Sequence, residues 1–255
     1  MSADPARARR TGPREHSVVV TPRYRLMRWL ILLAVGVLYR VRADGLDRWP
    51  EPPFLLLCNH HSGWDPMLVT SVVPERPRII WFGPKEQDFS RGFKNRLMRF
   101  FGGVIPYNPE KTTLVSAVRA VRRVFDARGV LGIFAEGRVG FRESELLPFE
   151  EGAVAFASAA GVPIVPCAIV GSADLWFRCR VTVRFGEPIA TGGFRGAPRR
   201  AELEERARAA LSALLPGREP PLPAFRPLAS IGEVLDGRDD RDRRRRERPR
   251  AERPR

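Results

Sequence analysis

Short uninterrupted apolar runs alternate along this chain with segments in which apolar residues recur at helical spacing. An uninterrupted run is typical of a strand buried on both faces of a sheet, and the chain has one at 54–58; mostly apolar segments at 79–82, 130–134 and 162–170 also predict strands. The sequence also predicts strands at 40–43 and 180–185, and helices at 22–38, 91–101, 114–125, 153–160 and 203–214. Strands that alternate with helices indicate an α/β fold with a mostly parallel central sheet flanked by helices.

Composition divides the chain into four parts. Residues 1–21 form a basic, flexible leader, residues 22–45 a helix with a lead-in strand, and residues 46–216 one α/β domain. From 217 to 255 the chain is rich in Pro and Arg, and we expect this tail to be disordered. With 255 residues in all, the chain is long enough to bury a sizeable core.

Positive charge is concentrated at the two ends. The net charge is +15, but residues 1–28 hold seven arginines against two acidic residues, and residues 238–255 hold ten arginines against five. Nucleic-acid binding surfaces interleave basic residues with exposed aromatic side chains on a folded domain. Here the arginines gather at the two ends of the chain instead, which argues against nucleic-acid binding. A non-catalytic protein that binds anionic membranes or nucleic acid through these ends is the alternative from another functional class.

The first apolar run, at 29–39, is only eleven residues long. A membrane-spanning helix needs about 20 apolar residues, so we expect this segment not to cross a bilayer. It begins at Trp29 and has arginines on both sides, a pattern that suits a helix lying in a membrane surface. An ordinary helix packed on the domain also fits the sequence.

The cysteines and histidines do not form a recognisable metal site. Cys58, Cys167 and Cys179 are scattered among apolar residues, and the three histidines lack ligand spacing. We expect reduced, buried thiols in a cytoplasmic protein. The sequence contains neither a Gly-x-Gly-x-x-Gly motif nor a phosphate-binding P-loop, so we expect no metal and no cofactor.

Candidate chemistry follows directly on the apolar run 54–58. There the chain reads Asn-His-His-Ser-Gly-Trp-Asp-Pro, which places His60 and Asp65 five positions apart. In parallel sheets, sites form where loops leave the carboxyl ends of strands, and a carboxylate that meets an imidazole there makes an oriented general base. Alternatively, Asp65 is only the N-cap of a helix whose first residue is Pro66, and His60 is an ordinary loop histidine. Because no Gly-x-Ser-x-Gly elbow is present, a base here would activate a substrate hydroxyl rather than an enzyme serine.

Three motifs, in order, resemble those of the glycerolipid acyltransferases, the 1-acylglycerol-3-phosphate acyltransferase family. Asn59-His60-x4-Asp65 after an apolar strand resembles the first motif of that family. Phe-Ala-Glu-Gly-Arg at 134–138 is similar to the third motif, Phe-Pro-Glu-Gly-Thr-Arg, and Val-Pro-Ile-Val-Pro at 162–166 to the fourth. The resemblance covers residues 54–172, so 46–216 is the expected acyltransferase domain.

The resemblance implies a role for each residue. His60 would deprotonate the acceptor hydroxyl, which attacks the thioester of acyl-CoA or acyl-carrier protein, and Asp65 would orient His60. Glu136, Gly137 and Arg138 would form the acceptor site, with a guanidinium on the phosphate, and we expect Glu136 and Arg138 beside His60 at the carboxyl edge of the sheet. The implied reaction is acylation of 1-acylglycerol-3-phosphate (lysophosphatidate) in phospholipid synthesis. It would take place at the cytoplasmic face of the cell membrane, which the protein would contact peripherally through its N-terminal helix, with no nucleic acid involved.

Two departures from the family concern the acceptor. The second motif of the family ends in a phosphate-binding Arg, whereas Gly-Val-Ile-Pro-Tyr-Asn-Pro at 103–109 has none. The third motif lacks its Thr, so Arg138 follows Gly137 directly. Another lysophospholipid or an amino-acid-based lysolipid is therefore the alternative acceptor, with the same chemistry at His60.

Overall fold

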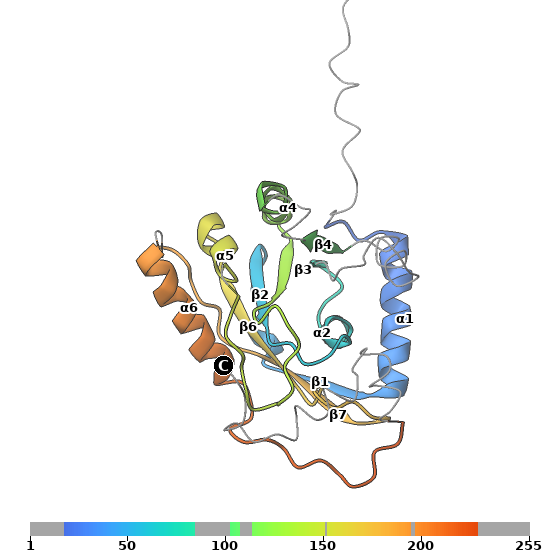
Figure 1. The fold of residues 1–255 in the computed structure, drawn as a ribbon. Coiled ribbons are helices and arrows are strands. Elements are labelled where there is room, and N and C mark those ends of the chain that lie inside the picture. Colours follow the sequence, from blue (N-terminus) through green and yellow to red (C-terminus); the bar gives the residue numbers. More distant parts are fainter. Residues whose placement is uncertain (1–17, 85–102, 108–113, 151, 195–196, 229–255) are drawn as a thin grey trace, which may run out of the picture.

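A computed structural model of the chain describes residues 18–84, 103–107, 114–150, 152–194 and 197–228. Within these residues, the centre is a seven-stranded sheet in the order β1-β7-β6-β2-β5-β3-β4, with helices on both faces (Figure 1). The neighbouring strands are parallel, except that β6 and β7 are antiparallel. The predicted α/β fold with a mostly parallel sheet is therefore confirmed.

The strands and helices follow the predicted order. The strands are β1 (Arg40–Asp44), β2 (Phe54–Cys58), β3 (Ile79–Pro84), β4 (Val104–Tyr107), β5 (Val130–Phe134), β6 (Ile164–Val170) and β7 (Arg180–Phe185). The helices are α1 (Pro22–Leu38), η3 (Leu46–Arg48, a 3-10 helix), α2 (Asp65–Val72), α4 (Leu114–Asp126), α5 (Ala155–Ala160) and α6 (Ala197–Ser212). The sequence pattern did not predict β4 or η3, and the helix predicted at 91–101 lies outside the described residues.

Strand β2 lies in the middle of the sheet, and all of its residues are buried. Leu56 and Cys58 pack in the layer that contains α1 and α2, while Leu55 and Leu57 pack in the layer that contains α4, α5 and α6. A strand that is covered on both faces has no solvent side on which polar residues could alternate. This double coverage explains the uninterrupted apolar run.

Helix α1 packs along α2 at one side of the domain (Figure 1). Thr21 caps its first turn, because Thr21 Oγ1 accepts a hydrogen bond from Tyr24 N at 3.2 Å. Arg28 donates to the carbonyl oxygens of Thr70 at 2.5 Å and Val73 at 2.7 Å, at the end of α2. These bonds satisfy carbonyl groups that have no partner within α2 itself.

Much of the surface of α1 is apolar and exposed. Its large apolar side chains that are 40–58% exposed are Leu26, Trp29, Leu30, Leu32, Leu33 and Val37. Tyr24 and Val35 are buried against the domain, so α1 is part of the folded unit. Among the described residues, no helix combines the length and the apolar character needed to cross a membrane.

Residues 217–228 follow α6 and run below β1 and β7 in Figure 1, toward the end of α1. Arg226 forms an ion pair with Asp174, and Phe177 N donates to Pro227 O at 2.8 Å. These contacts hold the segment on the domain, although composition assigned it to the disordered tail. The rest of that tail, residues 229–255, lies outside the described part of the chain.

Candidate active site

Loops that leave two neighbouring strands bring the candidate residues together. Cys58 ends β2 and Phe134 ends β5, and the two residues are paired in the parallel register. The loop after β2 carries His60 and leads to Asp65, while the loop after β5 carries Glu136. The candidate residues therefore gather at the carboxyl edge of the sheet, where sites form in parallel sheets.

His60 and Asp65 are in direct contact. His60 Nδ1 lies 2.9 Å from Asp65 Oδ2, and the same oxygen accepts hydrogen bonds from the backbone N–H groups of His61 at 2.7 Å and Ser62 at 2.8 Å. The Asp65 side chain is fully buried, whereas the His60 side chain is 19% exposed. A fixed, buried carboxylate thus meets an imidazole that is open to solvent on one side.

Asp65 does not cap its helix. Helix α2 begins at Asp65 itself, the N-cap position is Trp64, and no side-chain capping hydrogen bond is present there. A capping side chain accepts hydrogen bonds from N–H groups further along the helix, but this carboxylate turns back to the loop that precedes it. The interpretation of Asp65 as an N-cap is therefore wrong.

The surroundings of Asp65 keep it ionised. Burial alone would raise the pKa of this carboxyl, but the hydrogen bond and charge of His60, with smaller contributions from His61 and Ser62, outweigh burial and lower the pKa. An ionised carboxylate only accepts hydrogen bonds, so Nδ1 of His60 carries the proton. Nε2 is then the nitrogen that can take up a proton, as in an oriented general base.

A stack of aromatic rings supports the imidazole. The His60 ring lies on Phe134 with centroids 4.1 Å apart, and Phe134 lies on Trp81 with centroids 4.9 Å apart. Gly132 makes room for this stack, because an added Cβ would lie 2.5 Å from a ring carbon of Trp81. The ring of His60 is therefore fixed by Asp65 at one edge and by Phe134 across one face.

Glu136 lies beside His60, as predicted, and its carboxylate binds backbone. Oε1 accepts a hydrogen bond from His60 N at 2.9 Å, and Oε2 accepts one from Leu147 N at 2.8 Å. The side chain is fully buried, and burial raises its pKa. Glu136 thus ties the loop that carries His60 to the loop that follows β5.

Gly137 and Arg138 follow on the same turn. Gly137 has a φ of +61°, and an added Cβ would collide with the Glu150 side chain, so glycine is required there. Arg138 is exposed and forms no hydrogen bond or ion pair with any other described residue. The structure brings Glu136 to His60 but shows no such contact for Arg138.

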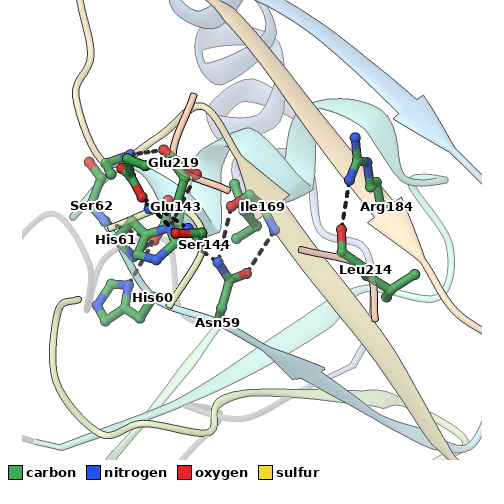
Figure 2. A network of polar contacts seen from close by, with 12 residues as sticks. Asn59, His60, His61, Ser62, Glu143, Ser144, Ile169, Arg184, Leu214 and Glu219 are labelled. Atoms are coloured by element: carbon green, nitrogen blue, oxygen red, sulfur yellow. Dashed lines mark hydrogen bonds and ion pairs between the residues drawn. The ribbon is translucent and has the colours of Figure 1, made fainter. Parts of the chain in front are cut away.

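Sequence reasoning missed the buried polar residues around the His60–Asp65 pair (Figure 2). The amide of Asn59 donates to Ile169 O at 3.0 Å and accepts from Ile169 N at 2.7 Å, so it joins the loop to β6. His61 Nδ1 lies 3.6 Å from Glu143 Oε2. Asn59 belongs to the first motif, so its place next to His60 could have marked it as a site residue. No spacing indicates a contact between His61 and Glu143, which are far apart in sequence.

The second motif lies only partly within the described residues. Residues 104–107 of the second motif form β4 beside β3, while 108 and 109 lie outside the described residues. Cys58, Cys167 and Cys179 are buried free thiols, as predicted. The described ranges contain no group of three or more His, Cys, Asp or Glu side chains placed to hold a metal ion.

Comparison with known proteins decides the family. The sequence model of the Acyltransferase family matches residues 40–170, about half of the chain. The chain belongs to this family.

The 1-acyl-sn-glycerol-3-phosphate acyltransferase alpha of Homo sapiens is 31% identical over 169 residues, which make up 61% of this chain and 54% of that protein. The Mus musculus protein of the same name is 27% identical over 185 residues, 64% of this chain and 60% of that protein. The chain thus spans little more than half the length of these relatives.

A solved structure shares the fold. The crystal structure of the 1-acyl-sn-glycerophosphate (LPA) acyltransferase PlsC from Thermotoga maritima superimposes with a TM-score of 0.56. The match covers 74% of this chain and 77% of that one, at 18% identity, so it concerns the fold alone. Together with the family match, it confirms the resemblance to the glycerolipid acyltransferases that the motifs predict.

Proposed function

We propose that this protein transfers a fatty acyl group from acyl-CoA or acyl-carrier protein to the hydroxyl of 1-acylglycerol-3-phosphate, with His60 as general base. The observation that carries the proposal is the 2.9 Å contact between His60 Nδ1 and the buried Asp65 carboxylate, which leaves Nε2 to accept a proton. The relatives named above, which are 1-acyl-sn-glycerol-3-phosphate acyltransferases, support the choice of acceptor.

One proton moves twice in the proposed reaction. His60 Nε2 takes the proton of the acceptor hydroxyl while the hydroxyl oxygen attacks the carbonyl carbon of the thioester. The Asp65 charge, 2.9 Å from the other ring nitrogen, stabilises the imidazolium that forms. When the tetrahedral intermediate collapses, the C–S bond breaks and the leaving thiolate takes the proton from Nε2. Ester and thiol are released, and His60 is neutral again; such a base contributes roughly 10²- to 10⁴-fold.

Arg138 is the residue that we assign to the phosphate of the acceptor. It is exposed, and it stands two residues after Glu136, whose carboxylate binds the backbone of His60. A planar guanidinium meets two phosphate oxygens at once. Gly137 would allow the turn that presents Arg138, and Glu136 would shape the acceptor site by holding its two loops together.

A different lysolipid is the second candidate acceptor. The segment 103–109 carries no Arg where the second motif of the family has its phosphate-binding Arg. A headgroup that needs fewer cationic contacts, such as that of another lysophospholipid or an amino-acid-based lysolipid, would tolerate this loss. The donor, the base and the order of proton transfers stay the same.

The proposed place of action is the cytoplasmic face of the cell membrane, with peripheral attachment. A lysolipid acceptor and its product reside in the bilayer, while the thioester donor is soluble. The exposed apolar side chains of α1 support attachment, because their transfer from water into lipid is favourable. Arginines near an anionic surface add about 1 kcal/mol each.

An acyl-transfer assay with a panel of acceptors tests the proposal. Purified protein is given acyl-CoA or acyl-carrier protein together with lysophosphatidate, other lysophospholipids or an amino-acid lysolipid, and the products are separated by mass. We expect the highest kcat/KM with lysophosphatidate. A preference for another lysolipid selects the second candidate, and no transfer to any acceptor contradicts both.

A further inference from the structure

Close to His60 lies a buried pair, His61 and Glu143 (Figure 2). Both residues are almost completely inaccessible to solvent, and His61 Nδ1 lies 3.6 Å from Glu143 Oε2. The amide nitrogen of Asn59 lies 3.2 Å from the same ring nitrogen of His61. Because this pair is closed to solvent, it takes no part in the proton transfers proposed above.

The loop that carries Glu143 contacts the base and its neighbour. Gly140 N donates to His60 O at 2.6 Å. Gly140 also lies against the His61 ring, since an added Cβ would come within 3.1 Å of His61 Cδ2. His61 N in turn donates at 2.7 Å to the Asp65 oxygen that binds His60. The position of this loop therefore affects both members of the His60–Asp65 pair.

Glu143 is anchored from two directions. Its Oε1 accepts a hydrogen bond at 2.7 Å from Ala173 N, in the loop after β6. Its own backbone N–H donates to Glu219 Oε1 at 3.1 Å, and Ser144 donates to Glu219 Oε2 from its backbone N at 3.2 Å and from Oγ at 3.0 Å. Glu219 lies in the segment 217–228, outside the region 40–170 that the family matches.

We propose that Glu143 is a positioning residue for acyl transfer, and that Glu219, which lies outside the region that matches the family, holds it in place. Glu143 lies against the His61 ring and, through its bond to Ala173 N, anchors the loop whose Gly140 binds the backbone of His60. A displacement of about 1 Å in a reacting group can lower turnover about 100-fold. This inference rests on the proposed function, because its main effect is on the turnover of that reaction.

Two substitutions at Glu143 separate positioning from packing. Glu143→Ala removes the carboxylate, and we expect kcat to fall about 10- to 100-fold, while KM for both substrates stays within about twofold, because the substrate contacts are unchanged. Glu143→Gln keeps the size of the side chain and an oxygen for the Ala173 N–H, and it removes only the charge. We expect this conservative variant to recover most of kcat.

A third variant tests the contact between Glu219 and the loop of Glu143 without creating a cavity in the core. Glu219 is exposed, so Glu219→Ala leaves the core intact. We expect its kcat to lie between those of wild type and Glu143→Ala. The double variant should be no slower than Glu143→Ala alone, because residues that act through one contact are not additive. Glu205→Ala, on the exposed surface of α6, is the matched control and should leave kcat unchanged.

A wild-type kcat in folded Glu143→Ala protein would overturn the inference. Equal losses of kcat in Glu143→Ala and Glu143→Gln, matched by equal losses of Tm, would also overturn it, because they indicate packing alone.

A readout without turnover is the exchange rate of the His60 Nδ1 proton by NMR, which is tractable in a chain with three histidines. We expect faster exchange in Glu143→Ala, and an unchanged rate contradicts positioning. If wild type transfers no acyl group, the proposed function fails, while the proton exchange still decides the role of Glu143.

Discussion

His60 and Phe134 stack with an angle of 22° between their rings, so the last residue of β5 supports the imidazole that follows β2. The two strands are parallel neighbours, which brings both residues to the same edge of the sheet. Phe134 in turn stacks on Trp81 of β3, with 6° between the rings. The orientation of the His60 ring therefore depends on side chains of β5 and β3, as well as on Asp65.

Gly132→Ala should lower both stability and turnover. The new methyl group would lie 2.5 Å from the ring of Trp81, so Trp81 must move, and with it the ring stack under His60. Overpacking of this kind costs about 1–3 kcal/mol, measured as the free energy of unfolding in urea. The control is Gly36→Ala in α1, where nothing lies within 4 Å of the added Cβ. It should stabilise the protein by about 0.5–1 kcal/mol. Effects of the same sign in the two variants would contradict this account.

Asp65→Asn should abolish turnover and leave the protein folded. The amide oxygen can still accept a hydrogen bond from the N–H of His61 or Ser62, but the side chain has no charge to stabilise the imidazolium of His60. We expect kcat to fall at least about 100-fold, with an unchanged near-ultraviolet circular dichroism spectrum. Near-normal turnover in this variant would show that the contact with His60 is only structural.

The pH dependence of stability should contain a contribution from Glu143. Burial raises its pKa in the folded protein, so the folded state binds more protons than the unfolded chain between the ordinary value of about 4.3 and the raised value. The free energy of unfolding therefore decreases as pH rises through that window. Glu143→Gln does not titrate and should show a smaller decrease, measured by urea unfolding at several pH values. Parallel curves for the two proteins would rule out this contribution.

The membrane proposal is best tested on the exposed surface of α1. Deletion of the helix would also remove Tyr24 and Val35 from the core, so we choose Trp29→Ser with Leu33→Ser, both exposed. The substitutions should release the protein from anionic vesicles more completely than high salt releases wild type. The reason is that salt screens the contribution of charge to binding but not the apolar contribution. Val115→Ser, an exposed apolar position on α4, is the control. Vesicle binding equal to that of wild type would exclude α1 as the anchor.

Local patterns made much of the fold and part of the site predictable. The bounds of β2 coincide with its apolar run because the strand is buried on both faces. The contact of His60 with Asp65 spans one loop, so spacing and position after a strand were enough to predict it. The position of Glu136 beside His60 was also predictable, because the two residues follow neighbouring strands of a parallel sheet.

Other features depend on contacts between distant segments. Asp65 follows a loop and precedes a proline, which suits an N-cap, but the N–H groups of His61 and Ser62 bind its carboxylate instead. The antiparallel direction of β7 is set by the connection from β6, and an alternating pattern alone does not give direction. Glu219 binds Glu143, which is 76 residues away in the sequence, and Ser144, which is 75 residues away. Neither composition nor periodicity could indicate this contact.

The most direct test of the central claim compares wild type with His60→Ala in a single assay. Acyl-CoA with a labelled acyl chain is mixed with lysophosphatidate, and labelled phosphatidate is followed over time. Wild type should form it steadily. His60→Ala, which removes a loop side chain that is 19% exposed, should remain folded and form product at least about 100-fold more slowly. Equal rates for the two proteins would contradict the assignment of His60 as the general base.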